Sequence, residues 1–456
     1  MKIIQVPYCF YPDPIGGTEI YVEALSHHLQ SQGLDILIAA PGAIDRTYQH
    51  QQLSVHRFAP SSKISDLRHF YGEGDRQAAL EFTRILDREN PDLVHLHALT
   101  SGVSLHLVRA AKQLQIPVVF TYHTPTVSCQ RGTMMRWGTE ICDGKVDLHA
   151  CARCTLQGLG LDRTSAKTIG SLPPQIGQWL GRLNLQGGAL TALRMTELIS
   201  LRHAALNALL SEVDRIVAVC NWVEDVLLIN HVSPDKITVI RQGLCHNLLE
   251  TTNSSQRPAT NNLKIAFLGR LHPTKGIHIL IGALRALPQL PISLDIYGIS
   301  NANDAYLQEL QAMAAKDLRI TFKPSVPAEN VISTLKGYDF LAVPSQWLET
   351  GPLVVLEAFA ARVPVIGSNL GGIAELVRHE VNGILVEPSS VSEWGQAFQK
   401  VCEDRELQMR LSTGIEIPQG MEAVATQMLS IYRAVLEGQV TAQTTGICDT
   451  NFQACD

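Results

Sequence analysis

Short apolar runs alternate with longer amphipathic stretches along the first half of the chain, and this pattern constrains the fold more than any other feature. Helical patterns such as Thr18–Gln32 and Ser101–Gln113 separate the apolar runs. Strands that alternate with helices form parallel sheets covered by helices. The pattern therefore predicts an α/β domain with a doubly wound sheet. Its expected strands are Ile3–Val6, Asp35–Ala39, Leu93–His97, Pro117–Thr121 and Arg215–Val219.

The same alternation restarts after a segment that lacks periodicity. Residues 248–262 are rich in Thr, Ser and Asn and predict a linker. A strand at Leu263 and a helix from Gly276 follow. A chain of 456 residues is too long for one ordinary core, so two Rossmann-like domains are expected, at 1–247 and 263–417. Further strands of the second domain are expected near Ile292, Ile320, Phe340 and Val365.

The last part of the chain predicts one helix and a tail. The helical pattern over 418–437 follows a break at Pro418, and we expect it to cross back and cover the first domain. Residues 438–456 are small and polar, which is typical of a disordered tail.

Composition narrows the class of partner. There are 37 Lys and Arg residues against 43 Asp and Glu, a net charge of −6, which argues against nucleic acid. The first residues do not resemble a signal peptide, and no apolar run reaches the 18 or more residues of a spanning helix. We expect a soluble, cytoplasmic protein, with peripheral contact at the inner membrane face as a further possibility.

Two cations follow the first strand of the second domain. Arg270 and Lys275 lie in the segment GRLHPTKG, at the carboxyl edge where open parallel sheets bind ligands. Cations and helix amino termini can stabilise a departing diphosphate. The chain contains no Asp-x-Asp pair, so we expect no catalytic metal. The alternative is a loop with two solvated charges.

A second cluster contains two carboxylates separated by seven residues, Glu349 and Glu357. Pro352 suits a helix start, which would leave the amides of Leu353 and Val354 free to bind a phosphate. An acidic side chain near such a site can accept the hydroxyls of a ribose. Glu357 could instead be a surface helix residue, although an unpaired carboxylate among its apolar neighbours would be costly.

Four motifs together resemble the retaining glycosyltransferases of family 4, which have the GT-B fold. They are Gly16-Gly17-Thr18-Glu19, Arg270 with Lys275, Glu349-x7-Glu357, and Val363-Pro364-Val365. The resemblance covers nearly the whole chain apart from a cysteine-containing insert and the tail. It implies two Rossmann-like domains that face a central cleft, with the nucleotide sugar bound mainly by the second.

The resemblance also implies roles for residues of the second domain. Arg270 and Lys275 would neutralise the diphosphate, Glu349 would hold sugar hydroxyls, and Glu357 would hold the ribose. Two departures from the family pattern affect this site. Gly351 comes one place early, so that Pro352 occupies the position of a glycine, and the loop after the strand at Ile320 has Lys323-Pro324-Ser325 where a glycine is usual.

In the first domain, the resemblance implies that Gly16 and Gly17 face the donor phosphates and sugar. The active-site histidine of the family matches His123 in FTYHTP. A histidine at a strand end can also be structural. His95 and His97 lie on another strand of the same sheet and are expected to be packing or cleft residues.

The implied activity is transfer of a sugar from a nucleoside diphosphate sugar to a glycan, a lipid-linked or a small-molecule acceptor, as in polysaccharide or glycoconjugate biosynthesis. The family resemblance implies retention of the anomeric configuration by front-face displacement, without an enzyme nucleophile. Two alternatives remain: a sugar-nucleotide epimerase of the same fold, and an inactive scaffold with a zinc knuckle.

The insert at 129–209 does not follow the alternation of strands and helices. Four cysteines in a C-x12-C-x8-C-x2-C arrangement predict a closed structural zinc site in a loop-rich knuckle. An iron-sulfur cluster, a redox pair or ordinary buried thiols are alternatives, and His149 could replace one ligand. The predicted ligands are Cys129, Cys142, Cys151 and Cys154.

The second part of the insert, residues 163–203, is helical in pattern and basic. It holds five Lys and Arg residues against one acid, Glu197, together with Trp179. Such a segment can lie on an anionic membrane, or can pack as helices with a solvated charged face. Because acceptor sites of GT-B enzymes lie largely on the first domain, the insert would be placed to shape acceptor choice.

Overall fold

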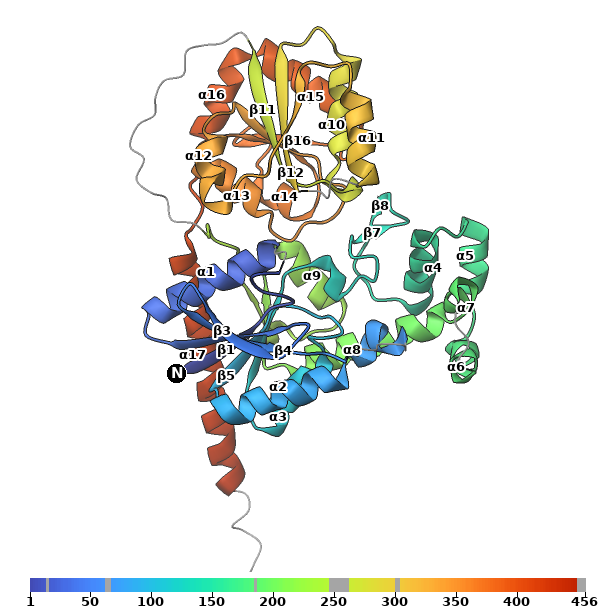
Figure 1. Ribbon diagram of the computed structural model, residues 1–456, viewed down its shortest axis with the longest axis vertical. Coiled ribbons are helices and arrows are strands. Elements are labelled where there is room, and N and C mark those ends of the chain that lie inside the picture. Colours follow the sequence, from blue (N-terminus) through green and yellow to red (C-terminus); the bar gives the residue numbers. More distant parts are fainter. Residues whose placement is uncertain (14–15, 62–66, 184–186, 246–261, 300–303, 449–456) are drawn as a thin grey trace, which may run out of the picture. The chain divides into compact units, whose positions relative to one another are not determined.

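The computed structural model describes residues 1–13, 16–61, 67–183, 187–245, 262–299 and 304–448. The chain divides into two compact units (Figure 1). Unit 1 comprises Met1–Arg241 with Met421–Asp456, and unit 2 comprises Gln242–Gly420. The linker predicted at 248–262 lies, apart from Asn262, outside the described residues.

Unit 1 is built on an eight-stranded sheet with the order β10-β9-β6-β5-β1-β2-β4-β3. All pairings are parallel except that of β3 with β4. The central strands are almost continuously buried, as expected when both faces of a parallel sheet are covered. The strands are β1 (Lys2–Val6), β2 (Asp35–Pro41), β3 (Arg46–His50), β4 (Leu53–Phe58), β5 (Leu93–Leu96), β6 (Val118–Tyr122), β9 (Arg215–Ala218) and β10 (Ile237–Val239).

The five strands predicted in the first half are present as β1, β2, β5, β6 and β9, which confirms the doubly wound class. The sequence did not indicate β3, β4 or β10. The edge strand β3 has the polar sequence RTYQH, and β10 is only three residues long. Neither strand is long and apolar enough to show a periodic pattern.

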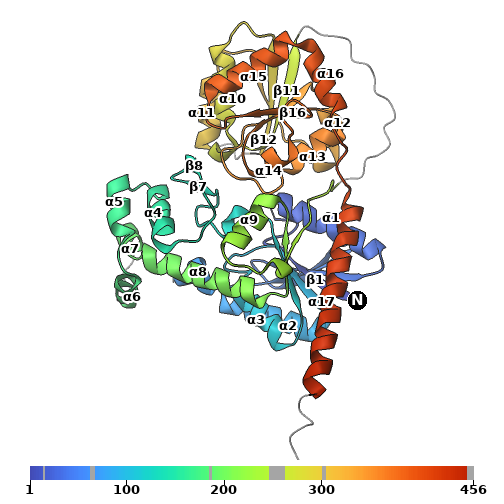
Figure 2. The same ribbon diagram turned by 180° about the vertical axis from the view of Figure 1, so that it is seen from behind.

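Helices cover the sheet of unit 1. Ile4, Val94 and Phe120 of three neighbouring strands contribute to one core together with residues of α2, α3, α8 and α9. Helix α17 packs along α1 (Figure 2) and buries Tyr432 completely. The helices are α1 (Gly17–Ser31), α2 (Arg76–Glu89), α3 (Leu105–Gln113), α8 (Met195–Glu212), α9 (Asn221–Ile229) and α17 (Met421–Cys448).

Helix α17 is longer than the sequence predicted. Residues 438–448 were expected to be disordered, yet the helix continues through them to Cys448. A helix that is already nucleated gains one hydrogen bond for each residue added, and this stretch contains no proline to stop it. The prediction of a disordered tail is therefore wrong for 438–448, and residues 449–456 lie outside the described residues.

The insert forms a helical arm at the end of α8 (Figures 1 and 2). A small core of its own includes Ala152 and Leu156 from α4, Ala166 from α5, and Met195 and Leu198 from α8. The loop-rich knuckle that was predicted around the cysteines is present over 129–147, which includes Cys129 and Cys142, whereas Cys151 and Cys154 lie on α4. The elements are β7 (Met135–Arg136), β8 (Glu140–Ile141), α4 (Leu148–Gly158), α5 (Arg163–Ile169), α6 (Pro174–Arg182) and α7 (Gly188–Leu193).

Unit 2 has a six-stranded parallel sheet with the order β13-β12-β11-β14-β15-β16. In chain order this is 3-2-1-4-5-6, and ligands of such sheets bind at the carboxyl ends where the order reverses, here between β11 and β14. Only β16 had not been predicted. The strands are β11 (Leu263–Arg270), β12 (Ile292–Ile299), β13 (Ile320–Lys323), β14 (Phe340–Val343), β15 (Val365–Ser368) and β16 (Gly383–Val386).

Successive residues of β11 supply the two cores of unit 2. Ile265 and Phe267 belong to one apolar cluster and Ala266 to the other, as the two-residue period of a strand requires. The helices around the sheet are α10 (Ile277–Ala286), α11 (Ala305–Ala314), α12 (Val331–Leu335), α13 (Leu353–Ala360), α14 (Gly371–Leu376), α15 (Val391–Glu403) and α16 (Arg405–Thr413).

Short helical turns complete the two units: η1 (His69–Glu73), η2 (Pro125–Val127), η3 (Pro234–Lys236), η4 (Pro273–Lys275) and η5 (Ala328–Asn330). Within the described ranges, no helix combines the length and the apolar character that crossing a membrane requires.

Candidate functional site

The loop after β11 is anchored to the segment that follows β14. Gly276 has a φ of 69°, and a methyl group at this position would overlap the carbonyl oxygen of Pro344. The amide of Gln346 donates to the carbonyl of Thr274 at 2.7 Å. Only glycine at position 276 permits this approach, which brings Lys275 to the neighbouring loop.

Lys275 and Glu349 form the charged centre of the site. The Lys275 Nζ lies 2.7 Å from Oε1 of Glu349, and the hydroxyl of Ser345 donates to the same oxygen. The ammonium group also lies 5.5 Å from the centroid of the Trp347 ring. The Lys275 and Glu349 side chains are only 19% and 9% exposed, so water screens the pair less than it would on the open surface.

Sequence reasoning had named Lys275 and Glu349 but had missed Ser345 and Trp347. The available signal was the polar segment Pro344-Ser345-Gln346-Trp347 directly after the fully buried strand β14. Side chains at the carboxyl end of a central strand are where ligands of such sheets bind.

The backbone around Glu349 is held by the loop after β15. The amide of Gly372 donates to the Glu349 carbonyl at 2.6 Å. The loops that follow β11, β14 and β15 therefore interlock at one edge of the sheet.

Helix α13 begins as predicted, with Pro352 as its N-cap. Pro352 makes no side-chain capping bond, and the first amides of a helix have no partner within it, so those of Leu353 and Val354 are available to an anion. Packing accounts for the glycine at position 351. A Cβ there would lie 2.6 Å from Oε1 of Gln242, a side chain that is 9% exposed.

Glu357 lies in the second turn of α13 and is partly buried. Loss of solvent raises the pKa of this carboxyl group to about 7. In the part of the chain that the structure describes, its carboxylate makes no hydrogen bond or ion pair. Such a group can accept hydrogen bonds from a ligand.

Arg270 ends β11 and is exposed. Its charge and that of Lys275 reach the ring of His272, whose pKa is lowered first by burial and then by these two cations. The charges of Arg270 and Lys275 therefore act on the same region of the site.

The Gly16-Gly17 motif of unit 1 forms the amino terminus of α1. Both glycines are exposed, and the amide of Gly16 donates to Oε2 of Glu19 at 2.8 Å. The side chain of Glu19 is folded back over the helix start, where a carboxylate is favoured by the helix dipole.

His123 follows β6 and is only 4% exposed. Its Nε2 lies 3.0 Å from Nδ1 of His97, and its ring packs edge-on against Tyr21 with centroids 4.8 Å apart. Burial lowers the pKa of His123 to about 3, so the ring is neutral near pH 7. His95 and His97 belong to the same buried polar network rather than to simple apolar packing.

The predicted zinc site is not found. Burial, with smaller contributions from the other three thiols, raises the pKa of Cys151 to about 12. Across the described ranges no group of three or more Cys, His, Asp or Glu side chains is arranged to hold a metal ion. The prediction assumed that the insert could not form a core unaided, whereas α4, α5 and α8 bury one. The predicted ligands were Cys129, Cys142, Cys151 and Cys154.

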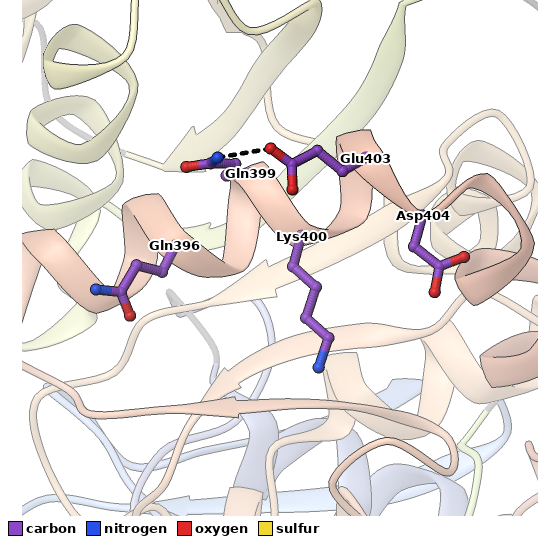
Figure 3. A pocket seen from close by; sticks show the side chains of 5 residues that line it. All are labelled: Gln396, Gln399, Lys400, Glu403 and Asp404. Carbon is purple, nitrogen blue, oxygen red and sulfur yellow. Dashed lines mark hydrogen bonds between the residues drawn. The ribbon is translucent and has the colours of Figure 1, made fainter.

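A surface depression on unit 2 is lined by side chains of α15 and by Asp404, which follows that helix (Figure 3). Its only cation, Lys400, is already paired with Glu380. Two carboxylates line it against this one cation, and this net negative charge disfavours a diphosphate. Its lining residues are Gln396, Gln399, Lys400, Glu403 and Asp404.

Comparison with known families gives one match in each half of the chain. Residues 15–144 match Glycosyltransferase Family 4, and residues 250–416 match Glycosyl transferases group 1.

Two curated relatives are D-inositol 3-phosphate glycosyltransferases. That of Corynebacterium efficiens is 29% identical over 225 residues, which cover 45% of this chain and 53% of the relative. That of Nocardia farcinica is 31% identical over 170 residues, which cover 35% and 36%. The match to the first of these relatives thus spans about half of that protein's length, and the match to the second about a third.

Solved structures match over nearly the full chain. Sucrose-phosphate synthase from Thermosynechococcus elongatus has a TM-score of 0.65 at 18% identity and covers 96% of this chain and 100% of its own. Anabaena Alr3699/HepE in complex with UDP-glucose has a TM-score of 0.59 at 16% identity and covers 97% and 100%. At these identities the likeness concerns the fold. With a family match in each half and this shared architecture, the chain belongs to the group 1, family 4 glycosyltransferases of GT-B fold.

Proposed function

We propose that the chain transfers a glycosyl group from a nucleoside diphosphate sugar to an acceptor hydroxyl, with retention of the anomeric configuration. The observation that carries this proposal is the Lys275–Glu349 pair at the carboxyl edge of the unit 2 sheet. A cation and a carboxylate 2.7 Å apart can contact two neighbouring parts of one donor molecule. The cation would meet the diphosphate and the carboxylate the sugar hydroxyls.

The diphosphate would be bound without a catalytic metal. Lys275 and Arg270 supply positive charge, and the amides of Leu353 and Val354 supply donors at a helix amino terminus. In unit 1 we propose that Gly16 and Gly17 also face the donor phosphates and sugar. These groups would stabilise the negative charge that develops on the leaving diphosphate.

Glu357 would hold the ribose of the donor. Its carboxylate has no partner in the described chain, and its raised pKa shows that the site lacks groups that favour the charged form. Two ribose hydroxyls would supply the hydrogen bonds that favour the charged carboxylate. The Anabaena Alr3699/HepE structures contain UDP and UDP-glucose, which makes UDP-glucose the first donor to test.

In the proposed reaction the bond from the anomeric carbon to the diphosphate oxygen breaks, and a bond from that carbon to the acceptor oxygen forms on the same face. The acceptor proton passes to the departing diphosphate oxygen, so no enzyme nucleophile is needed. We propose His123 as the active-site histidine of unit 1. A neutral ring can take part in hydrogen bonds there without adding charge.

The acceptor would be bound by unit 1, with the insert shaping the choice. The structure divides the basic residues of 163–203 into two groups. Arg194 pairs with Glu197 at 2.9 Å, where both side chains are nearly buried, and Arg202 bonds the backbone carbonyl of Thr126. These two arginines stabilise the insert and are not available to a membrane.

Helix α6 and the residue that follows it form an exposed amphipathic stretch. Trp179 and Ile176 of α6, and Leu183 just after it, are 60%, 40% and 46% exposed, and Arg182 beside them is exposed. Apolar side chains next to a cation suit the surface of an anionic bilayer. We therefore propose peripheral membrane contact through α6 and a lipid-linked acceptor.

Vesicle binding tests the contact. Trp179→Ala and Leu183→Ala should each lower sedimentation with vesicles that contain anionic phosphatidylglycerol, compared with neutral vesicles. Leu80→Ala is the control, because Leu80 is 58% exposed on α2, outside the insert. Equal binding by all three variants and the parent would contradict the proposal.

Product analysis tests the reaction itself. The protein is incubated with UDP-glucose or ADP-glucose and a mixture of acceptors in the presence of EDTA. A transferase releases nucleoside diphosphate and forms a glycoside only when an acceptor is present. An epimerase would instead isomerise the free donor, and an inactive scaffold would leave every donor unchanged.

A further inference from the structure

A chain of buried polar side chains links His123 to the C-terminal helix within unit 1. The Nε2 of His123 lies 3.0 Å from Nδ1 of His97, and Nε2 of His97 lies 2.7 Å from Oε1 of Gln5. The amide nitrogen of Gln5 then donates to the hydroxyl of Tyr432 at 3.1 Å. The side chains come from β1, the end of β5, the end of β6, and α17.

The chain continues beyond Tyr432 on a second arm. The Tyr432 hydroxyl lies 2.7 Å from Nδ1 of His95, and Nε2 of His95 lies 2.7 Å from Oγ1 of Thr121. His95, Thr121, Gln5 and Tyr432 are all completely buried. Buried polar groups of this kind must satisfy one another, because no water is at hand to do so.

All three rings are neutral, since burial lowers the pKa of His95 and His97 well below the usual value, as it does for His123. A neutral imidazole has one nitrogen that donates and one that accepts. The state of each ring is therefore set by its neighbour in the chain.

The direction of the hydrogen bonds follows from Gln5. An amide oxygen only accepts, so the Nε2 of His97 must carry the hydrogen that it donates to Gln5. The Nδ1 of His97 then has the lone pair and accepts from Nε2 of His123. In this arrangement Nε2 of His123 is protonated and Nδ1 is its accepting nitrogen.

Tyr432 holds the Gln5 amide in that orientation. The Tyr432 hydroxyl accepts from the Gln5 amide nitrogen and therefore donates to Nδ1 of His95. The Nε2 of His95 then donates to Thr121. Rotating the Gln5 amide by half a turn would reverse every bond of the chain and move the hydrogen of His123 to Nδ1.

We propose that Gln5, His97 and Tyr432 are positioning residues that select the Nε2-protonated tautomer of His123, with Tyr432 supplied by the C-terminal helix. The role of His123 rests on the proposed transferase function, whereas the tautomer itself does not. Helix α17 thereby adds one polar group to the network in addition to its apolar contacts.

The tautomer is measured directly. The protein is labelled with nitrogen-15 in its histidines, and long-range proton–nitrogen spectra at pH 7 report which ring nitrogen of each histidine carries the hydrogen. His123→Gln identifies the His123 signals. The proposal expects a protonated Nε2 on His123 and on His97, and a protonated Nδ1 on His123 would overturn it.

Tyr432→Phe then tests the selection. The substitution keeps the ring but removes the hydroxyl that distinguishes the two ends of the Gln5 amide. His123 should change from one tautomer to a mixture, and kcat should fall by up to about twofold as the competent population drops toward half. Tyr71→Phe is the control, because Tyr71 is buried in the separate core of the insert. An unchanged tautomer in Tyr432→Phe would refute the role of Tyr432.

The outcomes separate this inference from the proposed function. If His123 shows the expected tautomer but no donor is turned over, the network stands and the transferase proposal fails. If transfer occurs while the His123 tautomer is the opposite one, the transferase proposal stands and the network assignment fails. Unchanged nucleoside diphosphate affinity of Tyr432→Phe confirms that unit 2 has folded in the variant.

Discussion

The polar clusters of the two units differ in charge and in exposure. In unit 2, Lys275 and Glu349 are charged, lie in loops, and are still reached by solvent. In unit 1, His97 and His123 are neutral, lie at strand ends, and are buried under α17 and α1. A charged pair in a partly open loop can exchange its partner for a charged ligand. A closed neutral network can instead hold one ring in one orientation.

The pH dependence of stability should have opposite signs in the two units. The pKa of His123 is lowered to about 3, so the unfolded chain binds more protons below pH 6.5 and unit 1 loses stability as pH falls from 6.5 towards 3. The pKa of Glu357 is raised to about 7, so the folded unit 2 binds more protons and loses stability as pH rises from 4.5 to 7.

Lys275→Ala should have the largest effect. It removes the cation proposed to meet the departing charge, and we expect kcat to fall by about 10²–10³-fold, as for loss of one electrostatic stabiliser. Steady-state kinetics measures the change. Lys316→Ala is the control, since Lys316 is exposed on the same unit. A fall of kcat to no less than a third of the parent value would show that Lys275 is not in the reaction site.

Glu357→Gln should weaken nucleoside diphosphate binding by about 10–100-fold, the value of a charge-assisted hydrogen bond. Ribose hydroxyls that donate to the carboxylate should lower its pKa from about 7, so binding near pH 7 should release protons. Calorimetry in two buffers with different ionisation enthalpies measures the number of protons released. The glutamine variant should release fewer protons, and equal release would contradict the assignment.

The loss of unit 1 stability at acid pH should be an effect of intermediate size. Between pH 8 and pH 5, neutral burial of His123 should cost the parent protein about 2 kcal/mol of stability that His123→Gln does not lose. Urea unfolding of both proteins at the two pH values measures this difference. Parallel losses in parent and variant would mean that His123 is not kept neutral by the fold.

Arg270→Ala should have the smallest effect, because Arg270 is exposed. We expect nucleoside diphosphate affinity to fall by about 3–10-fold at low salt and by less at high salt. Isothermal titration at two salt concentrations tests this. Arg285→Ala, an exposed arginine at the end of α10, should leave affinity unchanged. A salt-independent loss in Arg270→Ala would indicate a role other than charge.

The sequence showed the fold class because periodicity is a local property. Strands β1, β2 and β11 are mainly apolar runs, and such runs are visible without knowledge of their partners. Strand β10 has only three residues, too few for a pattern. The error over the zinc site has a related cause, since cysteine spacing says little about whether the surrounding helices bury a core of their own.

The sequence by itself determined two α/β units, the cations after the strand at Leu263, and the two glutamates of the second unit, all of which depend on residue type and spacing along the chain. Only the tertiary structure joined Lys275 to Glu349, 74 positions apart, and Gln5 to Tyr432, 427 positions apart. Such pairs form when strand order and helix packing bring distant segments together. Their hydrogen bonds therefore depend on which element lies next to which, and no local pattern records this.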